Sequence, residues 1–229
     1  MARSFGEKVD ALRNAAEAST VRRLGCMRIV WQSAPMSLAP GRPTPARPHA
    51  LAVAALSRPG SPFRDLPARM LVADAGWQRL TLLESGLEIA DYPISTSAVG
   101  IGGEENSMRT PPGWHRIQAR IGEGAPSGAV FESREPTGAR WRGEPLEDDL
   151  ILTRILRLEG LEEGLNLGPG HDSFERYIYI HGTNHEEALG QPASHGCIRM
   201  ANADVIDLFA RVQIGDPVLV AGYEDAPVA

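Results

Sequence analysis

Short alternating runs of apolar and polar residues fill the chain from Met70 onward, and Gly and Pro separate these runs. One run covers residues 78–84 and the next covers 87–90; the Ser85-Gly86 pair between them is typical of a tight turn, so the segment predicts a β-hairpin. Residues 114–121 alternate in the same way and predict another strand. Further strands are expected at 128–132, 150–157, 176–181 and 217–221. This spacing of short strands favours a mainly β sandwich or barrel over alternating β and α units.

One segment has helical periodicity instead. Its apolar residues Val205, Leu208, Phe209 and Val212 are spaced i, i+3, i+4, i+7, which places them on one face of a helix. Asn202 is the candidate N-cap, and Gly215 follows the expected end of the helix. We therefore predict one or two short helices, with this one packed on the sheet.

The N-terminal part of the chain lacks such periodicity. Eight prolines lie between residues 33 and 67, a composition that buries too little apolar surface to offset the entropy of ordering. We expect residues 1–69 to form a disordered extension, or to include a start codon assigned too far upstream. Residues 70–221 are expected to form one domain, and residues 222–229 a short tail.

The charges divide the chain at the same place. Residues 1–69 hold 11 Lys and Arg against 4 Asp and Glu, whereas residues 70–229 hold 12 against 25. An acidic domain repels phosphate backbones, so nucleic acid is not expected as a partner. No apolar run reaches 18 residues, so no membrane span is expected. Residues 1–20 also lack the apolar stretch of a secretory signal, which favours a cytoplasmic location over the periplasm or cell envelope.

The segment from Tyr177 to Met200 concentrates the candidate chemistry. It contains His181, His185 and His195 together with Cys197, whereas the second cysteine, Cys26, lies far away in the N-terminal part. A free thiol is only a few per cent thiolate at pH 7, so a cysteine nucleophile needs an adjacent imidazole. Lowering the thiol pKa by about 2 units requires about 2.7 kcal/mol of thiolate stabilisation, which one imidazolium can supply.

Gly196 precedes the cysteine and can give the backbone an unusual direction. Without a β-carbon at this position, the N–H groups of Gly196 and Cys197 can point at one site, as in an oxyanion hole. The simpler interpretation of a lone glycine is an ordinary turn residue. Arg199, two residues after the cysteine, is the candidate for binding a substrate carboxylate, and a structural salt bridge is the alternative for it.

Two other interpretations use the same residues. His181, His185, His195 and Cys197 are ligands of the right types for a zinc ion, so spacing alone leaves a zinc-binding protein open. A non-catalytic binding module, with Cys197 as a small buried apolar residue, is the second alternative. The flanking histidines argue against this second interpretation, and a metal assay separates the first from a cysteine enzyme.

These segments resemble the L,D-transpeptidase catalytic domain (YkuD-type) family. The resemblance lies in His181-Gly-Thr and Ser194-His-Gly-Cys-Ile-Arg-Met200, with Thr110-Pro-Pro-Gly-Trp-His115 upstream, and it extends over residues 70–221. It implies that Cys197 is the nucleophile, that His181 is the proton donor and acceptor, and that His195 and Gly196 support the oxyanion geometry. It also implies peptidoglycan tetrapeptide stems or muropeptides as the substrate, sensitivity to carbapenems, and catalysis with no cofactor and no metal.

Within that family, residues 133–138 and 150–160 are most similar to cytoplasmic L,D-carboxypeptidases of muropeptide recycling. The resemblance therefore implies hydrolysis of the bond between the third residue, expected to be diaminopimelate, and D-Ala. An exported enzyme that cross-links peptidoglycan is the alternative, because water and an amine resolve the same thioester. The sequence leaves the acceptor and the oligomeric state open.

Overall fold

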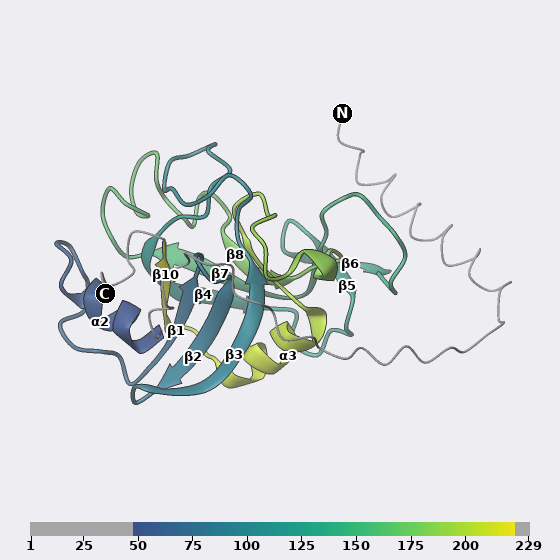
Figure 1. Cartoon of the computed structure of the whole chain (residues 1–229). Coiled ribbons are helices and arrows are strands. Elements are labelled where there is room, and N and C mark those ends of the chain that lie inside the picture. Colours follow the sequence, from purple (N-terminus) through teal and green to yellow (C-terminus); the bar gives the residue numbers. More distant parts are fainter. Residues whose placement is uncertain (1–47, 223–229) are drawn as a thin grey trace, which may run out of the picture. The chain divides into compact units, whose positions relative to one another are not determined.

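The computed structural model describes residues 48–222 of the 229-residue chain. Two α-helices, one 3₁₀ helix and ten strands lie within these residues (Figure 1). In chain order they are α2 (Pro48–Leu56), β1 (Arg69–Asp74), β2 (Arg79–Glu84), β3 (Leu87–Ser95), β4 (Gly113–Ile121), β5 (Ala129–Glu132), β6 (Glu135–Arg140), β7 (Ile151–Gly160), β8 (Tyr179–Gly182), η2 (Glu186–Ala188), β9 (Ile198–Met200), α3 (Asn202–Arg211) and β10 (Pro217–Ala221).

All ten strands belong to one sheet. Their order is β4-β10-β1-β2-β3-β9-β8-β7-β5-β6, and β4 pairs with β7 as well. This additional pairing closes eight strands into a ring and leaves β5 and β6 as a hairpin attached to β7. The predicted fold class, a mainly β sandwich or barrel with one or two short helices, is therefore confirmed.

Every predicted strand overlaps an observed one, and the predicted hairpin is β2 and β3. Ser85 and Gly86 have φ values of 49° and 78°, the left-handed values that a two-residue hairpin turn requires. The strand expected at 176–181 begins three residues late, at Tyr179, because the preceding residues form a turn: the Ile178 N–H donates to the Ser173 carbonyl and Tyr177 has φ 56°. Strands β1, β6 and β9 were not predicted.

Helix α3 packs its apolar face on the sheet, as predicted. Val205, Leu208 and Phe209 are buried in a cluster with strand residues that include Ile180 and Ile198. The prediction for Asn202 is wrong, because Asn202 is the first residue of the helix and Ala201 occupies the N-cap position. The Asn202 amide instead donates to the Thr183 carbonyl at 2.8 Å, which ties the start of α3 to the end of β8.

The predicted boundary at residue 69 is also wrong for the described residues. Helix α2 buries Leu51, Ala52 and Ala55 in a cluster with strand residues that include Met70 and Trp114. The Phe63 ring meets the Trp114 ring edge-on at 4.9 Å between centroids. Residues 48–69 thus belong to the folded domain, whereas the prediction for residues 1–47 lies outside the described residues. Neither helix of the described part is long and apolar enough to cross a membrane.

Candidate active site

Two rows of side chains on one face of the sheet form the candidate site. In the first row, Arg157 of β7 pairs with Tyr179 of β8, and the register of β8 with β9 places Cys197 beside Tyr179. In the second row, Ile155 pairs with His181, and His181 pairs with Arg199. Paired residues point to the same side of a sheet, so His181 and Cys197 are diagonal neighbours.

The opposite face of these strands carries apolar residues. Ile180, Ile198 and Met200 alternate with the site residues along β8 and β9, and all three are buried in the cluster that contains α3. This burial fixes the register, because a slip of one residue would move the apolar set to the site face. The strand period therefore explains why His181 and Cys197, 16 positions apart in the sequence, point to the same face.

His181 is held in one tautomer by the backbone. Its Nδ1 lies 2.8 Å from the Gly182 carbonyl oxygen, and a carbonyl oxygen only accepts hydrogen bonds. Nδ1 therefore carries the proton, and Nε2 is left as the acceptor. The side chain is almost completely buried, and this burial lowers the pKa of His181, with the Asp149 charge acting in the opposite direction. The neutral imidazole is thus the favoured state near pH 7, as a general base requires.

Cys197 is partly exposed, and it packs against a cluster that includes Phe131 and Tyr179. Its thiol donates to the Tyr177 carbonyl oxygen over 3.5 Å. Burial of the sulfur raises the pKa of Cys197 to about 11; the backbone of Tyr179 lowers that pKa and the Asp149 charge raises it further. The expected lowering of the thiol pKa is therefore not found, and the resting pair is a thiol beside a neutral imidazole.

Gly196 needs the conformational freedom of a glycine. Its φ of 126° lies in the region that side chains rarely adopt, and a β-carbon there would lie 3.4 Å from the Arg109 carbonyl oxygen. Its N–H donates to Ser194 Oγ at 3.2 Å, and that hydroxyl donates to the Cys197 carbonyl at 2.6 Å. The oxyanion role of the Gly196 and Cys197 N–H groups remains a prediction, and it requires the Gly196 N–H to leave Ser194.

Arg199 forms the salt bridge that was the alternative to substrate binding. Only 4% of its side chain is exposed, and its Nη2 donates to Asp149 Oδ2. His195 is mostly exposed, and its Nδ1 lies 3.4 Å from the same carboxylate oxygen. Asp149 is thus a residue of the site that the sequence did not indicate. In the sequence Asp149 follows Glu147 and Asp148, and an acidic run of this kind is usually solvated.

The four residues of the zinc interpretation are not brought together. In residues 48–222, no group of three or more His, Cys, Asp and Glu side chains could hold a metal ion. His185 instead lies 3.1 Å from Glu187 Oε1, beyond the end of β8. The geometry of the described residues therefore favours the thiol and imidazole pair over a metal centre.

Comparison with known proteins decides the family. The model of the YkuD family, the L,D-transpeptidase catalytic domain, matches residues 68–220, which include every site residue described above. The chain belongs to this family.

Individual relatives agree with the family match. A protein of Escherichia coli named as a probable L,D-transpeptidase, YbiS, is 26% identical over 176 residues, which are 74% of this chain and 52% of that protein. The Bacillus subtilis candidate L,D-transpeptidase YqjB is 51% identical over 45 residues, which are 20% of this chain and 26% of that protein. The chain thus spans about half the length or less of the curated relatives it matches.

Solved structures of L,D-transpeptidases are also similar. A Mycobacterium tuberculosis L,D-transpeptidase has a TM-score of 0.42 and 21% identity, over 68% of this chain and 58% of that chain. The L,D-transpeptidase LdtMt1, solved in complex with imipenem, has the same TM-score and identity, over 67% of this chain and 59% of that chain.

Arg176 has a structural role in this L,D-transpeptidase domain that its place in the sequence does not indicate. Its guanidinium donates to the carbonyl oxygens of Gly103 at 2.8 Å and Arg109 at 2.7 Å. It therefore holds the 103–109 loop, and the Arg109 carbonyl lies over Gly196. Arg154 likewise donates to backbone carbonyls, those of Ala125 and Thr153.

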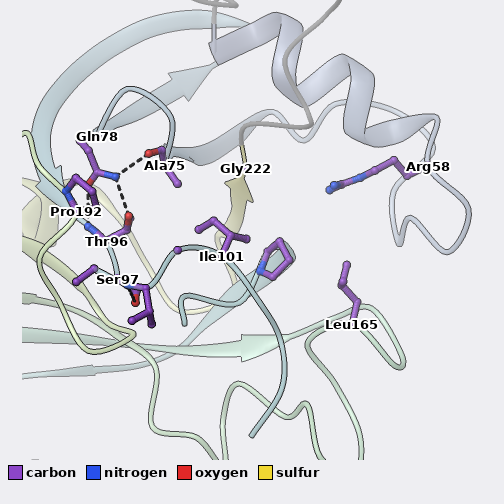
Figure 2. Close-up of a pocket in the computed structure, with 13 residues that line it drawn as sticks. Arg58, Ala75, Gln78, Thr96, Ser97, Ile101, Leu165, Pro192 and Gly222 are labelled. Carbon is purple, nitrogen blue, oxygen red and sulfur yellow. Dashed lines mark hydrogen bonds between the residues drawn. The ribbon is translucent and has the colours of Figure 1, made fainter. Parts of the chain in front are cut away.

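A cavity of about 710 Å³ in this L,D-transpeptidase domain is shown in Figure 2, and Cys197 is not among the residues that line it. Residues 96–101 form one of its walls, and none of the predicted site residues lines it. The Gln78 amide donates to the Ala75 carbonyl and to Thr96 Oγ1, each at 2.7 Å, and fixes that wall. Ser97, from the same wall, donates to the Met108 carbonyl at 2.6 Å. The cavity thus adjoins the loop over Gly196 without reaching Cys197.

Proposed function

We propose that this chain is a cysteine enzyme that attacks the bond before the terminal D-Ala of peptidoglycan tetrapeptide stems, through a thioester on Cys197. The observation that carries the proposal is the placement of Cys197 and His181 as diagonal neighbours on one sheet face, with Nε2 of His181 as an acceptor because Nδ1 carries the proton. The family match supplies the reaction class, acyl transfer.

Acylation starts from the neutral pair. As the sulfur attacks the scissile carbonyl, His181 Nε2 takes the thiol proton, because a thiol with a pKa of about 11 holds little thiolate beforehand. The imidazolium then gives this proton to the departing nitrogen, the bond between carbonyl carbon and nitrogen breaks, and D-Ala leaves with a neutral amine. The Asp149 charge favours the imidazolium while it exists.

Deacylation uses the same histidine in the reverse direction. His181 takes a proton from the incoming nucleophile, the nucleophile attacks the thioester carbonyl, and the sulfur leaves and regains its proton. We propose water as this nucleophile, which makes the chain an L,D-carboxypeptidase, and we propose the cytoplasm as its location. Water at about 55 M outcompetes a dilute amine unless the protein holds the amine in an attack geometry of large effective molarity.

The test is incubation with a defined tetrapeptide muropeptide in water enriched in ¹⁸O, with and without an amine acceptor, followed by mass spectrometry. Hydrolysis gives tripeptide with one ¹⁸O in its new carboxylate and one equivalent of D-Ala. The Cys197→Ala protein is the matched control and gives neither product. Cross-linked dimer as the main product would replace the carboxypeptidase by a transpeptidase, and an intact tetrapeptide would refute the proposed function.

A further inference from the structure

Arg157 lies on the same sheet row as the nucleophile. Arg157 pairs with Tyr179, and Tyr179 is flanked on its other side by Cys197. Neighbouring strands are about 4.8 Å apart, so the backbones of Arg157 and Cys197 are about 10 Å apart across two strand spacings. Both side chains leave the same face, so a ligand bound at Cys197 lies within reach of this guanidinium.

Stacking on an aromatic ring positions the Arg157 guanidinium, and an ion pair with a carboxylate does not. Its Cζ lies 3.3 Å from the centre of the Phe174 ring, and Nη2 donates to the Phe174 carbonyl at 3.0 Å. Its buried Nε has no hydrogen-bond partner in the part of the chain that the structure describes. Stacking of this kind fixes the plane of the guanidinium and leaves donor capacity for a ligand.

Arg134 reaches the same place from the tip of the β5–β6 hairpin. Glu132 pairs with Glu135, so Ser133 and Arg134 alone form the turn, with φ values of 49° and 73°. Turns of this kind favour Asn and Gly, and an arginine is unusual there. The Arg134 side chain lies over the Tyr177 ring at 5.0 Å and donates to Tyr179 Oη at 3.3 Å.

Neither of these arginines has an acidic partner among residues 48–222, and both adjoin Tyr179, the neighbour of Cys197 across the sheet. Arg199 is paired with Asp149, and Arg176 donates to loop carbonyls. Arg134 and Arg157 line a hollow of about 620 Å³, whose walls also include Ile121, Phe131 and Pro136 and the acidic residues Glu123 and Glu135. Two guanidinium groups without an acidic partner in the wall of one hollow suit a ligand that carries a carboxylate.

We propose that Arg134 and Arg157 together bind a carboxylate at the C-terminal end of the stem peptide and so determine substrate specificity. This inference rests on the proposed function. A scissile carbonyl in attack position is about 3–3.5 Å from the sulfur, and a carboxylate one residue further is about 3.8 Å beyond it. The sum is about 7 Å from the sulfur, which is shorter than the span of about 10 Å between the backbones of Cys197 and Arg157, and the side chains cover the remainder. The carboxylate belongs either to the terminal D-Ala or to the side chain of the third residue.

The experiment compares three tetrapeptides: one with a diaminopimelate third residue and free D-Ala, its D-Ala amide, and the analogue with lysine as third residue. The variants are Arg134→Gly, which gives the turn a residue it favours, and Arg157→Met, which keeps the length of the side chain. Arg140→Gln on the same hairpin is the control, since its guanidinium donates to the Ser127 carbonyl and does not line the hollow of Arg134 and Arg157. The measured quantity is kcat/KM for each peptide.

The expected result is a change in the ratio of kcat/KM between the peptide that carries the bound carboxylate and the peptide that lacks it. The wild-type enzyme prefers the peptide with the bound carboxylate by about 10- to 100-fold, and both variants bring this preference close to one. If the variants lose the preference for free D-Ala over the D-Ala amide, the bound carboxylate belongs to D-Ala. If they lose the preference for the diaminopimelate peptide over the lysine peptide, it belongs to the third residue. The control keeps the wild-type ratio.

The same ratios are measured as Kd by calorimetry on the Cys197→Ala background, so the arginines are tested even without turnover. Ratios in Arg134→Gly and Arg157→Met that equal the wild-type ratios, in kcat/KM or in Kd, overturn the inference. Absence of turnover of every stem peptide by the wild-type enzyme refutes the proposed function separately.

Discussion

The substitution Asp149→Asn removes the charge of the ion pair beside the nucleophile and keeps the size of the side chain. Arg199 is then left without its counter-charge, and only 4% of its side chain is exposed. Breaking a buried pair in this way costs about 3–5 kcal/mol. The Asp149 side chain is 29% exposed, so water screens part of the pair and we expect a loss of about 2–3 kcal/mol. For a domain of this size, the melting temperature should fall by about 4–12 °C.

The assay is unfolding by heat and by urea at pH 7. Glu147→Gln is the matched control, because it removes the same charge from an exposed side chain two residues away. The double variant Asp149→Asn/Arg199→Met should lose less stability than Asp149→Asn alone, because no unpaired guanidinium remains buried. A loss in Asp149→Asn within about 0.5 kcal/mol of the control would refute the reasoning.

The same variant tests the electrostatics of the catalytic pair. The Asp149 charge raises the pKa of His181, so its removal lowers that pKa further. Neutral imidazole, the form that accepts the thiol proton, then persists to more acidic pH. The acid limb of the profile of kcat/KM against pH should therefore move to lower pH in Asp149→Asn, and a limb that stays in place or moves to higher pH would contradict this assignment.

Three further predictions concern the nucleophile, the pH range and the helix. Cys197→Ala and Cys197→Ser should abolish turnover with unchanged circular dichroism, and a carbapenem should add once to the wild-type protein and not to either variant, as read by intact mass. The wild-type kcat/KM should rise with pH through a pKa below 6.5 and stay level from pH 7 to 9. The reason is that burial lowers the pKa of His181 and raises the pKa of Cys197 to about 11. A further rise centred near pH 8.5 would indicate that a free thiolate reacts instead. Leu51→Ala, at a buried position of α2, should lower the free energy of unfolding by about 2–5 kcal/mol, whereas Val53→Ala on its exposed side should cost far less; equal losses would show that α2 does not pack as described.

The strands and the segments that carry His181 and Cys197 could be predicted because their signals are local. Period-two alternation identified β2, β4 and β10, and His181 and Cys197 stand in segments of a few residues with a specific pattern. Helix α2 was missed because its residues 50–56 are apolar on every side, so they give no helical periodicity, and prolines surround them. Contact with Met70 and Trp114 stabilises this helix, and the local sequence alone does not predict that contact.

The partners of the site residues could not be predicted, because they depend on strand register. Asp149 meets Arg199 from 50 positions away, and Arg157 reaches the nucleophile only through the pairing of β7 with β8. Acidic runs, and arginines in strands, are usually solvated in proteins, so neither pattern indicates a site residue. The nearby histidines in the sequence predict a lowered pKa for Cys197. The burial that raises this pKa results from packing across strands, which the local sequence does not show.

A backbone carbonyl orients His181, so side-chain substitutions have little effect on the orientation of this imidazole. Many catalytic histidines are oriented by a carboxylate side chain, which a single codon change can remove. Here the acceptor is the main chain of Gly182, which every amino acid would provide. Substitution at Gly182 acts only through the space around its Cα, where a β-carbon would lie 2.6 Å from Asn202 Oδ1 and 2.8 Å from the Leu152 carbonyl oxygen. The tautomer of His181 is therefore set by the main chain of the strand, and a substitution can change it only by disturbing the sheet.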